Sequence, residues 1–113
     1  MMYEIRNYHF DPALFEDYKA WAKSKALPYL SNALDLVGFW TNLPEESDII
    51  GEPMDGLGSA NITWIIRWED KATRDSAFEA AFSTPEWQAI FAEVPGGFDS
   101  YKRMEAKFTE ALI

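Results

Sequence analysis

The chain has 113 residues and a mass of 13.0 kDa, which fits a single domain over residues 1–113. Its 19 acidic and 10 basic residues give a net charge of −9, so nucleic acid and anionic membrane surfaces are not expected as partners. The absence of cysteine excludes disulfides, thiolate catalysis and iron–sulfur clusters. No apolar stretch approaches the ~20 residues that span a bilayer, and we expect a cytoplasmic protein.

The first third of the chain predicts a strand followed by a helix. Residues Met2–Phe10 are rich in aromatic and β-branched side chains, as is typical of a strand, and they end at a turn signal. From Pro12 to Ala33 apolar residues recur at spacings of three and four, which predicts a helix with a buried stripe formed by Leu14, Tyr18, Trp21 and Ala22. Because Pro28 frees the carbonyl of Ser24, we expect a kink or a break in this helix.

The middle of the chain predicts another strand and then an irregular segment. Residues Leu36–Asn42 have strand character, and Gly38 indicates a bulge or a close backbone approach. Residues 44–60 contain five acids, no base, three Gly and two Pro, without periodicity of either kind. We therefore expect a long loop that is either a functional lid or a mobile excursion between strands.

The next strand, Asn61–Trp68, carries bulky side chains on both faces instead of alternating apolar with polar residues. Such a strand must be covered on both sides. Only two helical segments are visible in the chain, and two helices cover one face of a small sheet. We therefore expect a second copy of the chain to cover the other face, which would make the protein a homodimer.

The last third predicts a helix in two parts and a final strand. Asp70 suits the N-cap of a helix whose shared face is formed by Arg74, Phe78, Ala81 and Phe82. Thr84 and Pro85 suit the cap and the first position of a helical restart, which Pro95–Gly97 ends. Residues Asp99–Phe108 alternate as a strand, with one face formed by Met104, Ala106 and Phe108.

The element order βαββαβ predicts an α+β protein of the ferredoxin-like class. In this fold a four-stranded antiparallel sheet carries both helices on one face, with the first and third strands in the centre. The topology alone does not identify a function. It also occurs in RNA-binding domains, but the net charge of −9 argues against that function here.

Several segments together resemble the NIPSNAP family over nearly the whole chain. They are Tyr3–Tyr8, Pro28, Val37–Trp40, Arg74 and Thr84–Trp87. The resemblance implies a dimeric α+β barrel, in which two ferredoxin-like sheets pack open face to open face. It implies no reaction, since the family has no settled biochemical activity. The acidic segment 44–60 departs from the family because it is longer than the usual connection.

The first strand carries the main candidate for a binding site. Glu4, Arg6 and Tyr8 share one of its faces, because neighbours in a strand alternate. Enclosed in a cavity, Arg6 and Tyr8 would bind a ligand carboxylate or carbonyl. The alternative is a structural network in which Arg6 pairs with Glu4 or with an acid of a partner copy.

The other candidates come from the second and third strands. The guanidinium of Arg67 either donates two hydrogen bonds to an anion, or it extends into solvent at the end of the strand. Trp40 and Trp64 line a pocket for a planar ligand, or they are packing residues of the sheet.

Little in the sequence supports a metal or a cofactor, and none is expected. His9 is the only histidine, it falls on the opposite face from Arg6, and a solvated or hydrogen-bonded role suits it better than a general base. The acids of residues 44–60 lack the spacing of a helix-loop-helix calcium site.

These observations predict a NIPSNAP-like homodimer that encloses a small-molecule cavity between its sheets, with Arg6, Tyr8 and Arg67 as polar anchors and Trp40 and Trp64 as walls. The alternative is a cofactor-independent monooxygenase or isomerase that acts on a small aromatic or polyketide-like substrate. A third class, a purely structural or interaction module, predicts a dry interface without a cavity.

Overall fold

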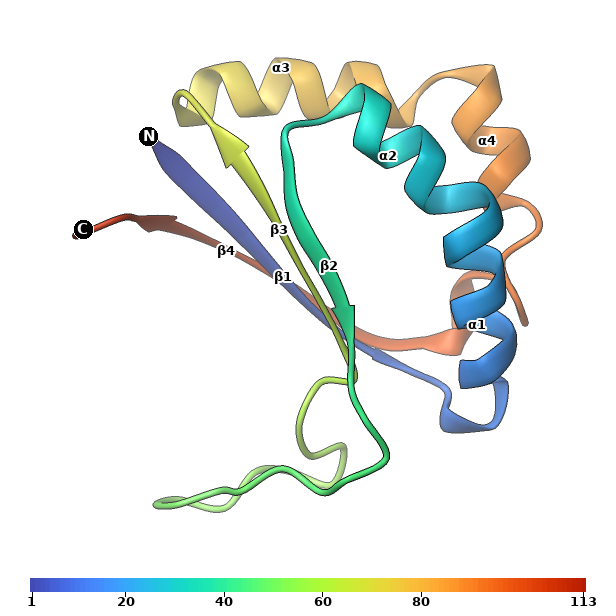
Figure 1. The fold of residues 1–113 in the computed structure, drawn as a ribbon, viewed down its shortest axis with the longest axis vertical. Helices are drawn as coiled ribbons and strands as arrows, with labels where there is room; N and C mark the ends of the chain where they lie inside the picture. Colours follow the sequence, from blue (N-terminus) through green and yellow to red (C-terminus); the bar gives the residue numbers. More distant parts are fainter.

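The computed structural model describes all 113 residues and contains a four-stranded sheet. Figure 1 shows the helices on one face of this sheet. The sheet order is β2-β3-β1-β4 and every pairing is antiparallel. The strands are β1 (Met2–Phe10), β2 (Leu36–Thr41), β3 (Ile62–Trp68) and β4 (Tyr101–Glu110). The predicted ferredoxin-like fold, with the first and third strands in the centre, is confirmed.

The first helical segment, predicted as one broken helix, is built in four pieces. These are a 3₁₀ turn (Pro12–Leu14), α1 (Phe15–Trp21), a π-helical turn (Ala22–Ala26) and α2 (Leu27–Ala33). The N–H of Leu27 donates to the carbonyl of Ala22, five residues back. Because Pro28 has no N–H to offer Ser24, the widened turn absorbs the mismatch just before the proline. The predicted break is confirmed.

The second helical segment consists of α3 (Lys71–Phe82) and α4 (Pro85–Phe91). Asp70 caps α3 by accepting the N–H of Thr73 at 2.7 Å, and Thr84 caps α4 by accepting the N–H of Trp87 at 3.0 Å. Both caps satisfy backbone donors that the first turn leaves unpaired, as the sequence predicts. A further 3₁₀ turn (Phe98–Ser100) leads into β4.

The strand register assigns the side chains to two different faces. Glu4, Arg6 and Tyr8 lie opposite residues of β3 on the face that the helices cover, which also bears Ile62, Trp64, Ile66 and Trp68. Met104, Ala106 and Phe108 share one face of β4, as predicted, and the register places this face on the helix side of the sheet. Ile5 and Ile65 pair on the opposite, open face. The hydrophobic core therefore lies between the sheet and the helices of the same chain.

Residues 44–60, the acidic arm, have no regular structure, as predicted. Figure 1 shows the arm projecting from the end of β2 and β3, on the side of the sheet away from the helices. An ion pair between Arg103 of β4 and Asp55 connects it to the sheet. No helix in the protein combines the length and the apolar character that crossing a bilayer requires.

Candidate functional site

A cavity of about 190 Å³ lies between the sheet and the helices. Tyr8 and Trp64 reach it from the sheet, and Trp21, Phe82 and Trp87 reach it from the helical layer. Of the 14 residues that line it, 13 are hydrophobic, and Arg6 is the only charged one. The cavity is therefore an apolar chamber with a single ionic corner.

The location of this cavity differs from the expected one. The expectation placed a chamber between the sheets of two copies, whereas this chamber lies within one chain. Alternation along a strand tells which side chains share a face, but not which face the helices cover. Hydropathy gives conflicting answers, since the covered face carries the more apolar side of β3 but the charged residues Glu4 and Arg6 of β1.

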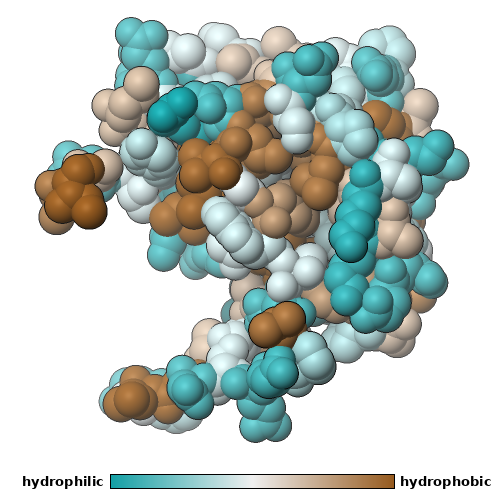
Figure 2. Space-filling model, in the orientation of Figure 1, coloured by the Kyte–Doolittle hydropathy of each residue, from teal (hydrophilic) through white to brown (hydrophobic).

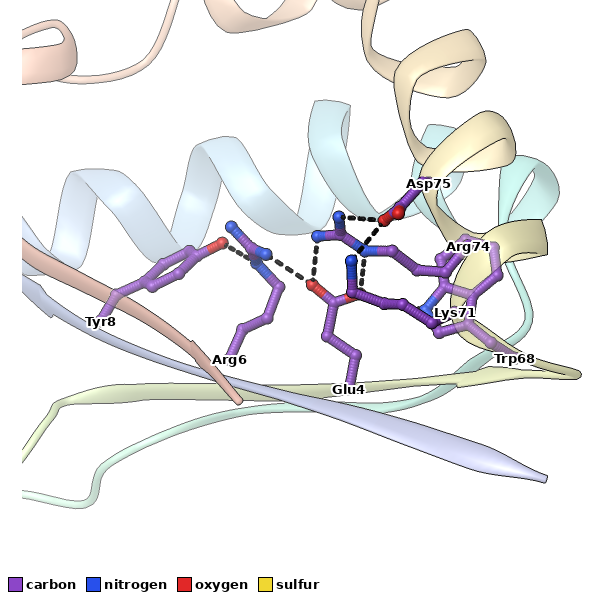
Figure 3. Close-up of polar contacts among 7 residues, drawn as sticks. All are labelled: Glu4, Arg6, Tyr8, Trp68, Lys71, Arg74 and Asp75. Carbon is purple, nitrogen blue, oxygen red and sulfur yellow. Dashed lines mark hydrogen bonds and ion pairs between the residues drawn. The ribbon is translucent and has the colours of Figure 1, made fainter. Parts of the chain in front are cut away.

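The ionic corner is built around Glu4, whose side chain is fully buried (Figure 3). Its Oε2 accepts from Arg6 Nη1 at 2.7 Å and from Arg74 Nη2 at 2.8 Å. Its Oε1 accepts from Arg74 Nε at 2.9 Å and from Trp68 Nε1 at 3.0 Å. Burial raises the pKa of Glu4, but the hydrogen bonds and charges of Arg74 and Arg6 outweigh it and hold the pKa below its ordinary value. Glu4 is therefore a buried carboxylate that stays ionised at neutral pH.

The network continues outward along α3. Arg74 also contacts Asp75 at 3.3 Å, and Asp75 pairs with Lys71 at 2.7 Å. Three cations (Arg6, Arg74 and Lys71) thus face two carboxylates (Glu4 and Asp75), which leaves one excess positive charge. Arg6 has Glu4 as its only ion-pair partner and shares it with Arg74. Lys71 and Asp75 are about half exposed, so the buried part of the network consists of the guanidiniums of Arg6 and Arg74 around the single carboxylate of Glu4.

Arg6 connects this network to the cavity. Its Nε donates to Tyr8 Oη at 2.5 Å, and its guanidinium lies 5.5 Å from the ring centre of Trp64 and 5.1 Å from that of Phe78. Burial raises the pKa of the Tyr8 phenol, although the charge and the hydrogen bond of Arg6 oppose the shift. Tyr8 is therefore a neutral phenol at physiological pH, held against a guanidinium.

Trp64 contributes an unusual feature of the same corner. Its side chain is buried, with 4% exposed. Its indole Nε1 lies near the Tyr8 hydroxyl and helps to oppose the rise that burial causes in the pKa of that phenol, but it forms no hydrogen bond of normal geometry with any group in the chain. An unpaired buried donor costs roughly 1–3 kcal/mol. Native proteins seldom leave such groups unpaired without a reason, so this N–H marks a position where a ligand acceptor would fit.

The five predicted site residues separate into two groups. Arg6, Tyr8 and Trp64 line the cavity. Arg67 and Trp40 lie on the open face, since their strand partners are Tyr3 and Thr63. The five predicted site residues therefore do not line one chamber within the chain, because alternate side chains of a pleated strand point to opposite sides of the sheet.

On the open face the two excluded residues have local structural contacts. Arg67 donates to Asp35 at 2.8 Å, and both side chains are about half exposed. Trp40 is 50% exposed, and its indole lies over Gly38, where a Cβ would come within 2.4 Å of the ring. This close approach explains the glycine in β2. His9 lies on this face too, as predicted, beside Asn7 and Arg103.

The sequence reasoning missed the role of Arg74, although its signal was present. Arg74 shares the apolar helix stripe with Phe78 and Phe82. A lone arginine on a core-facing stripe requires a buried acidic partner, and Glu4 is the acid on the covered face of β1. Arg6 does pair with Glu4, and Arg74 completes that network, while a ligand-binding role of Arg6 stays a prediction.

Comparisons with known proteins match this chain by structure. Neither a protein-family model nor a curated protein matches the sequence. An uncharacterized NIPSNAP domain protein from Burkholderia xenovorans has a TM-score of 0.75 and 17% identity, with 98% of this chain and 94% of that chain covered. A NIPSNAP family protein of unknown function from Agrobacterium tumefaciens has a TM-score of 0.74 and 17% identity, with 96% and 86% covered. An antibiotic biosynthesis monooxygenase has a TM-score of 0.56 and 8% identity, with all of both chains covered.

At these identities the likeness shows the fold. The chain has the ferredoxin-like α+β fold that these NIPSNAP proteins share, over nearly its whole length. The ferredoxin-like fold expected from the resemblance in the sequence is confirmed, and the pairing of two copies into a barrel stays a prediction.

Proposed function

We propose that this protein is a NIPSNAP-like homodimer that binds a small molecule in the cavity between its sheet and its helices. The observation that carries the proposal is the unpaired N–H of Trp64, which lies in an aromatic chamber beside Arg6. A chamber that only filled the core would have no need of a charged residue and an unsatisfied donor. The fold of the NIPSNAP structures supports the assignment to that class.

The homodimer is proposed from the open face of the sheet. Ile5 and Ile65 are partly exposed at its centre, and Trp40 is half exposed. Figure 2 shows the molecule hollowed on this side, between the body and the acidic arm. A second sheet in that hollow would bury the apolar residues that the helices do not reach. We place the dimer in the cytoplasm, without nucleic acid or membrane as partner.

The test of the binding function is native mass spectrometry of the protein purified without added ligand. We expect a species of twice the 13.0 kDa chain mass that retains a small molecule. Release of that molecule after Trp64→Phe, but not after the same change at Trp40, would place it in the cavity. A particle with an empty chamber that also fails to bind any compact aromatic compound would contradict the proposal.

A second candidate function is a cofactor-independent monooxygenase or isomerase. The favouring observation is the grouping of Arg6, Tyr8 and Trp64, whose donors would stabilise the oxygen of an enolate as it forms. The test is turnover of an enolisable aromatic compound in air. Turnover that is lost after Tyr8→Phe supports catalysis, whereas binding without turnover leaves the binding function alone.

A further inference from the structure

We infer that the ligand of this cavity is a compact aromatic anion whose charged oxygen, a carboxylate or a phenolate, is held by Arg6, Tyr8 and Trp64. The inference rests on the proposed binding function and names the chemical class of the ligand. Donor count, charge balance and cavity size each support it.

The donor count is the first observation. Arg6 uses Nε for Tyr8 and Nη1 for Glu4, whereas its Nη2 has no partner within the chain. Figure 3 shows no contact from one guanidinium nitrogen of Arg6 to the other residues drawn. The oxygen of Tyr8 accepts from Arg6, so its own proton still requires an acceptor. The indole N–H of Trp64, which lies near the Tyr8 hydroxyl without a hydrogen bond of normal geometry, is the one of these three donors that is both buried and unsatisfied. The missing partner is an oxygen with several lone pairs.

The charge balance is the second observation. Arg6 and Arg74 share the single buried carboxylate of Glu4, and the network with Asp75 and Lys71 has one positive charge in excess. A guanidinium does not lose its proton in proteins, and the buried phenol of Tyr8 is neutral at physiological pH. Neither group removes the excess charge. An anion in the cavity does, and its attraction to Arg6 is strong because little water screens it.

The size and the walls of the cavity define the rest of the ligand. An apolar protein cavity of about 150 Å³ holds one benzene molecule. A chamber of about 190 Å³ therefore suits one ring or two fused rings. Trp21, Trp87 and Phe91 provide ring faces and edges at centroid separations of 5.8 to 6.5 Å. Such walls favour a planar aromatic body over a flexible chain.

The experiment compares matched probes by isothermal titration calorimetry on the full chain. The probes are 2-naphthoate, its neutral isostere 2-naphthamide, acetate, and 4-nitrophenol on either side of its ionisation near neutral pH. We expect naphthoate to bind at least about tenfold more tightly than naphthamide, since a hydrogen bond to a charged group contributes more than a neutral one. Acetate should bind much more weakly than naphthoate because it lacks the ring. Comparing the binding of 4-nitrophenol above and below its pKa shows whether a phenolate can take the place of the carboxylate.

Variants locate the anion within the chain. Trp64→Phe and Tyr8→Phe each remove one donor and should each weaken naphthoate binding about tenfold, with little effect on naphthamide. Tyr8→Phe loses a single oxygen, so it tests the site even if Trp64→Phe folds poorly. Trp40→Phe makes the same change on the open face and should leave both affinities unchanged.

The possible outcomes distinguish failure of the inference from failure of the proposed function on which it rests. Equal affinity for naphthoate and naphthamide would overturn the anionic class and leave cavity binding intact. Tight naphthoate binding that Trp64→Phe and Tyr8→Phe do not weaken would overturn the assigned residues. Failure of every probe to bind would overturn both the inference and the proposed function.

Discussion

The two faces of the sheet differ both in their residues and in how far they are covered. Along β3 the covered side chains of Ile62, Trp64, Ile66 and Trp68 are between 0% and 7% exposed. Their immediate neighbours Thr63 and Ile65 are partly exposed. The open side of β3 also carries the exposed Arg67, so both the composition of the strand and the helical layer separate its two faces. The difference teaches that an apolar face is buried only where the fold supplies a cover.

Charged groups differ between the faces in the same way. On the covered face Glu4 accepts four hydrogen bonds from three side chains. On the open face Arg67 and Asp35 form an ion pair, and both side chains are about half exposed to solvent. Burial removes the water that would otherwise solvate a carboxylate, so the protein must provide every partner itself. The predictions below test this difference, beginning with the largest expected effect.

The largest effect is expected when the buried carboxylate is neutralised. Glu4→Gln leaves Arg6 and Arg74 facing each other without an anion, and it should lower the free energy of unfolding by about 3–5 kcal/mol. The matched control is Asp35→Asn on the open face, whose exposed pair is solvated and which should change the stability much less. Urea unfolding at fixed protein concentration measures both. Equal losses in the two variants would show that burial does not distinguish the two faces.

The next effect concerns the cover of the open face. Ile65→Glu places a charge in the centre of the proposed dimer interface and should raise the dimer dissociation constant by about a hundredfold or more. Sedimentation velocity over a range of concentrations measures this. Lys25→Glu changes the charge of an exposed position on the helical layer and should leave the dimer intact. A wild-type chain that sediments as a compact 13.0 kDa particle at high concentration would refute the dimer itself.

A smaller effect is expected at the close approach on the open face. The Cβ of Gly38→Ala would come within 2.4 Å of the Trp40 ring, so the indole must move away. Because that side chain is half exposed and free to move, we expect a cost of only about 1 kcal/mol. In an NMR spectrum one of the five indole N–H signals should shift. Gly56→Ala is the control, since nothing lies within 4 Å of its added Cβ.

The smallest effect is a pH dependence of the buried network. The folded pKa of Glu4 lies below its ordinary value of 4.5, so the ionised carboxylate contributes stability that is fully present above that pH. This contribution is lost as the pH falls through the folded pKa. The difference in unfolding free energy between wild type and Glu4→Gln should therefore narrow below pH 4.5. Glu16→Gln, at a side chain that is 85% exposed, should show no comparable narrowing. A constant difference for Glu4→Gln down to low pH would contradict a lowered pKa.

The elements were predictable because local chemistry decides them. The apolar spacing from Pro12 to Ala33 corresponds to the observed helical pieces, and Thr84 with Pro85 begins α4 as predicted. The last strand begins at Tyr101, two residues later than predicted, because a 3₁₀ turn over Phe98–Ser100 precedes it. The first and last residues of a strand depend on its pairing with a neighbouring strand. The alternation of side chains within one segment contains no information on that pairing.

The candidate site was predictable only in part. Arg6, Tyr8 and Trp64 follow from their position on central strands, and all three line the cavity. Trp40 and Arg67 were grouped with them although they lie on the opposite side of the sheet. The contact of Glu4 with Arg74 joins residues 70 positions apart, and no local pattern connects them.

The amino-acid sequence alone determined the order of helices and strands and the residues that share each strand face. These properties depend on residues only a few positions apart in the sequence, because apolar periodicity and helix caps are local patterns. Only the tertiary structure decided which face the helices cover, and therefore which residues surround the cavity. It also brought Arg74 to Glu4, because a buried charge is satisfied by whatever donor the packing of distant segments provides.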